Sequence, residues 1–190
     1  MSNKAQAHRY SVESGAWEYL TESTPMLAEI DHRPATVICD ILYWPTKSRY
    51  IIALDNAKKS LKYIECPDET HDIFRLNLHI FKGHNGDVAL AVIRYFTLQT
   101  WSSTRSSAGD HVSWTHHINV ELDTLLALGK SFPYHGKYAV RLLCIFKDRD
   151  VLVVRVKEGV FQLDMSNWQW KTYNSARRWC TLHPYSVRPG

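Results

Sequence analysis

One strand–break–strand pattern occurs three times in this chain. Each copy begins with an aspartate and continues with an apolar run, a short polar or charged break and a second apolar run. The copies are "DILYWPTKSRYIIALD" (Asp40 to Asp55), "DVALAVIRYFTLQTW" (Asp87 to Trp101) and "DVLVVRVKEGVFQLD" (Asp150 to Asp164). Two short apolar runs joined by turn residues predict a β-hairpin. The opening aspartate is expected to be a turn residue at the chain reversal.

Further strands extend each copy to a unit of about four strands. "LKYIEC", "WTHHINVEL" and "WQWKTY" follow the copies, and "LNLHIF" and "RLLCIF" precede the last two. Runs such as "VLVV" are apolar at successive positions, which is typical of strands covered on both faces, whereas a sandwich predicts cleaner alternation. We therefore expect an all-β fold, a partial β-propeller of about three to four four-stranded antiparallel blades. The single domain, residues 1–190, would have blade units near 36–66, 76–122 and 139–173, with partial strands at both ends.

Aromatic residues fit this expectation. The chain has seven Trp and ten Tyr, mostly inside short β-branched runs, and such side chains pack well on pleated surfaces. Trp44, Trp101 and Trp170 lie in or beside the repeated units and are predicted to be structural core residues that fill the space between blades, because each indole ring buries a large apolar area.

A set of short motifs adds a family resemblance. In order they are "SVESGAW", "HRPA", "LYW", "HDIFR", "LQTW", "ELDTLL", "GVFQLD" and "HPY". Together they resemble the C-terminal β-propeller (F-box-associated) domain of a plant F-box protein family, from about Ser11 to Tyr185. The chain departs from the pattern at Cys39-Asp40, where the family often has Gly-Asn. It also lacks F-box helices before Ser11 and ends "SVRPG" after "HPY". We expect a fragment or truncated product that lacks the F-box itself.

The resemblance implies a function in target recognition. In such proteins an F-box binds the adaptor of a cullin-type ubiquitin ligase and the propeller holds the target. The expected role is a non-enzymatic protein-recognition domain whose partner is a protein target, with the ligase adaptor a second partner only if an F-box is present upstream. Two alternatives stay open: a stand-alone interaction module or truncated product with no ubiquitin role, and an unrecognised hydrolase, since propellers also host enzymes.

Motifs for catalysis, metals and cofactors are absent from the sequence. His71, His79 and His84 do not have a known ligand spacing, and the chain has no nucleophile elbow and no glycine-rich phosphate loop. Its four cysteines are far apart, fall in or beside apolar runs and form no C-x-x-C pair, which favours buried reduced thiols. We expect no catalytic residues, no metal and no cofactor.

The "HDIFR" segment is the best candidate for recognition that the sequence offers. It joins two of the units and places His71, Asp72, Phe74 and Arg75 where a loop between blades would emerge. The segment could equally be a brace between blades, with Asp72 and Arg75 paired and Phe74 packed inward. The brace is the favoured interpretation.

Charge and hydropathy limit the other partners. The net charge of +4 comes from 23 basic and 19 acidic residues scattered along the chain, so we expect no nucleic-acid partner. No signal-peptide core and no membrane-spanning run is present, which predicts an intracellular protein, cytoplasmic or nuclear, with no membrane partner. Open edges of the first and last blades are expected to permit self-association.

Overall fold

The computed structural model describes residues 4–23, 28–70, 77–105, 112–127, 140–146, 150–156 and 159–173. A two-stranded hairpin, β1 (Ala5–Ser11) and β2 (Ala16–Ser23), comes first, and three four-stranded antiparallel sheets follow. The first sheet consists of β3 (Thr36–Ile38), β4 (Ile41–Pro45), β5 (Tyr50–Asp55) and β6 (Ser60–Glu65). The second consists of β7 (Leu78–Lys82), β8 (Val88–Arg94), β9 (Thr97–Arg105) and β10 (Val112–Glu121). The third consists of β11 (Val140–Phe146), β12 (Val151–Val156), β13 (Gly159–Asp164) and β14 (Trp170–Tyr173).

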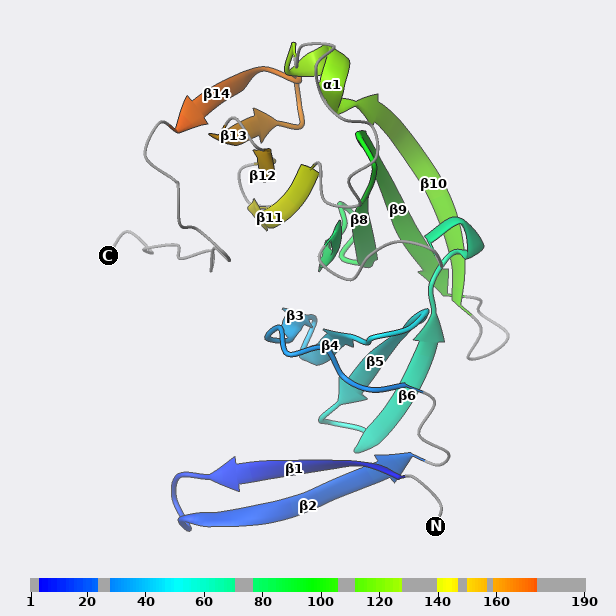
Figure 1. Cartoon of the computed structure of the whole chain (residues 1–190). Helices are drawn as coiled ribbons and strands as arrows, with labels where there is room; N and C mark the ends of the chain where they lie inside the picture. The colour runs from blue at the N-terminus through cyan, green and yellow to red at the C-terminus, as the bar shows by residue number, and fades with distance from the viewer. Residues whose placement is uncertain are drawn as a thin grey trace.

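Strands that follow one another in the sequence are also neighbours within each sheet. The hairpin and the three sheets succeed one another along an arc, with the hairpin at one end and the third sheet at the other (Figure 1). Two short helical turns, η1 (Asp68–Thr70) and α1 (Leu122–Leu125), are the helical elements of the described residues. The fold is therefore all-β and has the form of a partial β-propeller, which confirms the expected fold class.

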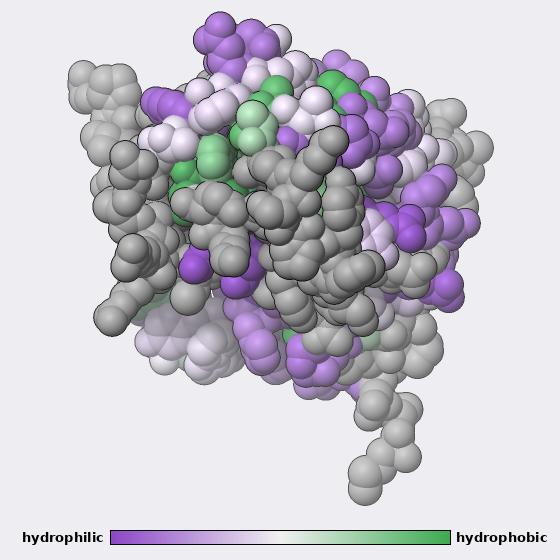
Figure 2. All heavy atoms as spheres, turned by 45° about the horizontal axis from the view of Figure 1, so that its top comes forward, coloured by the Kyte–Doolittle hydropathy of each residue, from purple (hydrophilic) through white to green (hydrophobic). Residues whose placement is uncertain are grey.

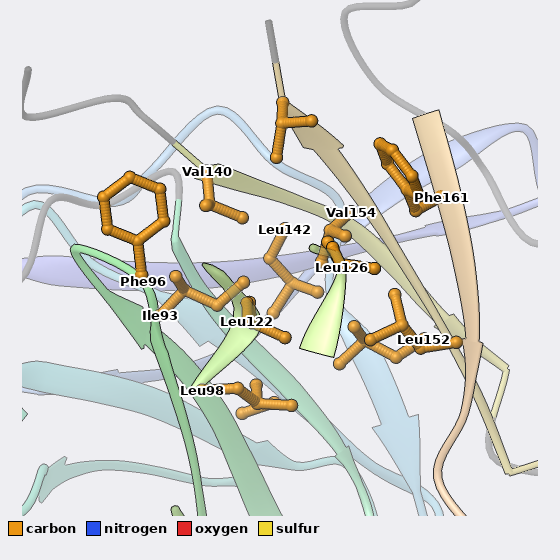
Figure 3. Close-up of a cluster of buried hydrophobic side chains, with 13 residues drawn as sticks. Ile93, Phe96, Leu98, Leu122, Leu126, Val140, Leu142, Leu152, Val154 and Phe161 are labelled. Carbon is orange, nitrogen blue, oxygen red and sulfur yellow. The ribbon is translucent and has the colours of Figure 1, made fainter. Parts of the chain in front are cut away.

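Stacking of the sheets explains the apolar runs. β8 is buried from Val88 to Ile93 because its alternate residues face two different clusters. Leu90 and Val92 pack with the first sheet, whereas Ala91 and Ile93 pack with the third sheet and with Leu122 of α1. Figure 3 shows this second cluster, in which side chains from the second and third sheets point toward one another. On the face shown in Figure 2, hydrophobic residues form only small patches among hydrophilic ones.

The aspartates that open the three repeats all lie at the turn between the first and second strands of a sheet. Cys39 and Asp40 form a two-residue connection with φ of 48° and 63°, as a type I′ turn requires. In the second sheet Gly86 supplies the positive φ of 80° just before Asp87. In the third sheet Asp150 itself has a φ of 49°.

A second kind of turn joins the third and fourth strands. Asp55 accepts a hydrogen bond from the Lys58 backbone at 2.9 Å, and Asp164 accepts one from the Ser166 backbone at 2.9 Å. The Lys58 backbone hydrogen bond lowers the pKa of Asp55, and the Ser166 hydroxyl, which also donates to Asp164, lowers the pKa of Asp164. Four residues after each aspartate the backbone has positive φ, 48° at Lys59 and 59° at Trp168.

The hairpin β1–β2 repeats this second turn. Ser11 occupies the aspartate position, and its hydroxyl accepts a hydrogen bond from the Ser14 backbone at 3.3 Å. Gly15, four residues after Ser11, has a φ of 65°, and its N–H donates to the Ser11 carbonyl at 2.9 Å. The hairpin therefore corresponds to the outer two strands of a sheet, and within the described residues its strands pair only with each other.

Polar side chains join the innermost strands of neighbouring sheets. Arg33, ion-paired with Asp31, donates to the Leu78 carbonyl. Burial lowers the pKa of Arg33, although Asp31 opposes this. Asn77 and His79, from the start of the second sheet, bind the backbone of β11. Each sheet is thus fixed to the next by hydrogen bonds as well as by apolar packing.

Candidate recognition site between the second and third sheets

A pocket of about 530 Å³ opens between the second and third sheets, at the end where β7 turns into β8. The turn between β13 and β14 and the start of β12 complete its lining. Phe81, Met165 and Trp168 line the pocket and also pack against the hydrophobic cluster shared by the two sheets. The pocket is therefore the place where this buried interface opens to solvent.

Polar groups form the rim of the pocket. Asp87 and Asp150 contribute carboxyl groups, and His84 and Asn85 project from the β7–β8 turn as exposed side chains. Among the described residues that line the pocket there is no Lys or Arg. An apolar floor under an acidic rim is an arrangement that suits a ligand with both an apolar body and a polar end.

Local backbone geometry places these side chains. Gly83 donates to the Asp87 carbonyl at 2.7 Å, and Gly86 donates to the Gly83 carbonyl at 3.1 Å, so the segment between them turns sharply and projects His84. In the β13–β14 turn the backbone N–H of Trp168 donates to the Asp164 carbonyl at 2.8 Å. This hydrogen bond holds Trp168 in its positive-φ conformation beside the pocket.

A bulge in β10 contributes a further wall residue. The pairing of β10 with β9 shifts between His116 and Ile118, so His117 is the extra residue. Its Nε2 lies 2.6 Å from the Ser102 hydroxyl, and both residues line the pocket. Bulges commonly redirect a side chain toward a site.

The wall of the pocket contains a hydroxyl–imidazole pair of the kind found in catalytic relays. Ser102 and His117 form two members of a Ser–His–acid relay, but no carboxylate hydrogen-bonded to His117 is found in the described part of the chain. The described residues also contain no group of three or more His, Cys, Asp or Glu side chains able to hold a metal ion. Cys66 and Cys144 are buried, which raises the pKa of each thiol to about 12, whereas Cys39 is exposed, contrary to the expectation of burial.

The sequence of the chain matches, over residues 1–187, the family described as "F-box protein AT5G49610-like, beta-propeller". The chain belongs to this family. The match includes the hairpin, the three sheets and every residue that lines the pocket. It confirms the resemblance to an F-box propeller domain, and membership of this family indicates a protein-interaction role. No curated protein sequence matches the chain.

Of the candidate residues that the sequence suggests, the tryptophans lie in the described sheets, whereas the recognition segment does not. His71, Asp72, Phe74 and Arg75 lie outside the described residues. Trp101 is 7% exposed within the cluster between the first and second sheets, and its ring lies 4.7 Å from that of His116. Trp44 is half-buried in β4, and Trp170 is 42% exposed, 5.5 Å from the Phe161 ring.

Sequence reasoning did not identify the pocket. The sequence predicts Asp87 and Asp150 only as turn residues, and both do lie at the turns that open the second strands of their sheets. The signal that could have found the pocket is the position of the two aspartates: each precedes the second strand of its sheet, and in stacked sheets of one topology such turns lie at the same end and come close together.

No helix in the described ranges is long and apolar enough to cross a membrane.

Proposed function

We propose that this chain is a non-enzymatic protein-recognition domain that holds a target at the pocket between the second and third sheets. The family match over residues 1–187 carries the proposal, because it makes this stack of sheets a propeller of the F-box type. The pocket supports it, since its apolar floor and polar rim lie on surface turns, where scaffolds of this kind carry binding residues.

Variants at the mouth of the pocket test this proposal. His84→Trp places a bulky ring at the rim, whereas Ala57→Trp places the same ring on the exposed turn between β5 and β6 and is the matched control. Proteins captured by the wild-type chain would be quantified by mass spectrometry for all three forms. We expect His84→Trp to lose a defined set of partners by about fivefold or more, as for a residue at the centre of an interface. Equal capture by the two variants would argue against the pocket.

A finer proposal is that the domain is the target-binding part of a substrate receptor in a cullin-type ubiquitin ligase. Family membership supports this role, and an F-box in the same polypeptide is what the role requires. Sequencing the 5′ end of the native transcript tests for an in-frame F-box, and co-precipitation from the source cells tests for the adaptor and the cullin. Partner capture without either would instead favour a stand-alone interaction module. We place the protein in the cytoplasm or nucleus, which imaging of a fluorescent fusion tests.

We also propose that two copies of the chain associate through the β1–β2 hairpin. His8, Tyr10, Trp17 and Tyr19 share one face of the hairpin, with the Tyr10 and Trp17 rings 5.4 Å apart. Tyr10 and Trp17 are 49% and 71% exposed. Tyr10 precedes Ser11 of the β1–β2 turn just as Leu163 precedes Asp164 of the β13–β14 turn. Leu163 is fully buried between the third and second sheets.

The charges of the hairpin permit contact with a second copy. Arg9 pairs with Glu18 and Lys4 with Glu22, so these charges are balanced within the hairpin itself. The Tyr10→Ser, Trp17→Ser double variant should therefore reduce the mass measured by light scattering to that of a monomer, whereas Tyr95→Ser, at an equally exposed ring elsewhere, should not. A monomeric wild-type chain would refute this proposal.

A further inference from the structure

We infer that the pocket between the second and third sheets binds an arginine side chain of the target protein. This inference rests on the proposed recognition function and names the chemistry of the group that the pocket accepts.

The described lining of the pocket carries charge of the opposite sign to that of the chain. The whole chain has a formal charge of +4, yet the described lining contains two aspartates and no Lys or Arg. Asp87 is half-buried at the rim, and no ion pair involving it is found among the described residues. A carboxylate in this position attracts a cation, and a partly enclosed pocket strengthens that attraction relative to open water.

The floor and walls suit the rest of an arginine side chain. Phe81, Met165 and Trp168 provide apolar and aromatic surface in the same pocket as the carboxylates, on the side that packs against the buried cluster. The methylene groups of arginine can cover such surface while the guanidinium stays at the polar rim. A guanidinium also stacks on aromatic faces and donates in a planar fork to carboxylates, whereas an ammonium group is a compact charge without a planar fork.

Other side chains fit the pocket less well. An aspartate or glutamate of the target would approach the carboxyl group of Asp87, and like charges at close range repel. A leucine or phenylalanine would fill the floor but remove water from the Asp87 carboxylate without replacing its hydrogen bonds, which is unfavourable. Arginine satisfies both parts of the lining at once.

Capped tripeptides test the inference on the wild-type chain. Acetyl-Ala-Arg-Ala-amide would be compared with the citrulline peptide, which has nearly the same shape without the charge, and with the lysine and glutamate peptides. Binding would be followed by NMR of the tryptophan indole N–H signals, with the Trp168 signal assigned by the Trp168→Phe variant. We expect the arginine peptide to bind about tenfold more tightly than citrulline, as charge-assisted pairs allow, with lysine between them and glutamate the weakest.

Replacement of one carboxylate gives an independent measurement. Asp87→Asn keeps the backbone hydrogen bond that the turn uses and should weaken arginine binding about fivefold, the usual effect of one lost charge pair. Glu13→Gln removes one carboxylate from the exposed β1–β2 turn and should leave binding unchanged. Asp87 is chosen for replacement because its neighbours in the sequence on both sides are described.

The outcomes separate this inference from the proposed function. Equal binding of the arginine and citrulline peptides, or no binding of either, overturns it, and this comparison does not depend on any variant folding. If His84→Trp still loses protein partners while the peptides do not discriminate, recognition at the pocket stands and its arginine preference is wrong.

Discussion

Asn77 and Leu142 are 65 positions apart in the sequence and are hydrogen-bonded across the boundary between the second and third sheets. The Leu142 N–H donates to Asn77 Oδ1 at 3.3 Å, while Asn77 Nδ2 donates to the Val140 carbonyl at 2.9 Å. His79 Nε2 lies 3.0 Å from the Leu142 carbonyl, so both backbone groups of Leu142 are bound by side chains of the neighbouring sheet. These bonds hold in register the two sheets that form the pocket.

Asn77→Leu should therefore destabilise the fold. The substitution leaves the Val140 carbonyl and the Leu142 N–H without these partners in a buried site, and the expected loss in free energy of unfolding is about 2 to 4 kcal/mol. Asn119→Leu, which removes exposed hydrogen bonds from β10, is the control and should cost less than about 1 kcal/mol. Urea unfolding followed by tryptophan fluorescence measures both. Similar losses for the two variants would mean that the bonds of Asn77 contribute little.

The ionisation of His79 makes stability depend on pH. Burial, together with the nearby Arg33, lowers the pKa of His79 from 6.5 to about 4. In the unfolded chain the imidazole takes up a proton near pH 6.5, whereas in the fold it stays neutral until about pH 4, so stability falls as the pH decreases between these values. At about 1.4 kcal/mol per pH unit the contribution of this group is on the order of 3 kcal/mol.

The comparison that isolates this effect uses His79→Gln, which keeps a donor for the Leu142 carbonyl and cannot titrate. Free energies of unfolding measured between pH 7 and pH 4 should fall more steeply for the wild-type chain than for the variant. Parallel curves would show that His79 is not held neutral in the fold.

The turn at Cys39-Asp40 offers a stabilising change. Both residues have positive φ, 48° and 63°, a conformation that is unfavourable for cysteine and less favourable for aspartate than for glycine. Replacing the pair with Asn-Gly, the preferred type I′ sequence, should raise the free energy of unfolding by about 1 kcal/mol. Cys39→Ala removes the thiol without relieving the backbone, so no gain is expected from it. A thermal midpoint of the Asn-Gly variant at or below that of Cys39→Ala would contradict the turn assignment.

The tryptophans predicted to fill the space between blades should differ in their contribution. Trp101 is 7% exposed, so its replacement by Ala should lower the free energy of unfolding by about 3 to 5 kcal/mol, the usual range for a buried large aromatic. Trp170, 42% exposed, should cost less than about 1 kcal/mol. Chemical denaturation of the two Ala variants measures the difference. Equal losses in the free energy of unfolding would mean that the Trp170 ring is as well buried as that of Trp101.

Local patterns in the sequence predicted the strands and their stacking because both depend on short-range signals. The run from Val88 to Ile93 is apolar at every position, and only a strand covered on both faces accounts for it. The Ser11-to-Gly15 spacing also matches Asp55-to-Lys59, so the role of the hairpin could have been found from the sequence. The pocket could not, since Asp87 and Asp150 are 63 residues apart and meet only through the packing of two sheets.

Site-specific photo-crosslinking tests the proposed recognition site most directly. A benzophenone amino acid would replace His84, exposed at the mouth of the pocket, or Tyr95, which is 63% exposed at the other end of β8. Both forms would be irradiated in extract of the source cells and the crosslinked proteins identified. We expect discrete protein adducts from position 84 that an excess of the arginine tripeptide suppresses, and few from position 95. Adducts from position 95 with none from position 84 would contradict recognition at this pocket.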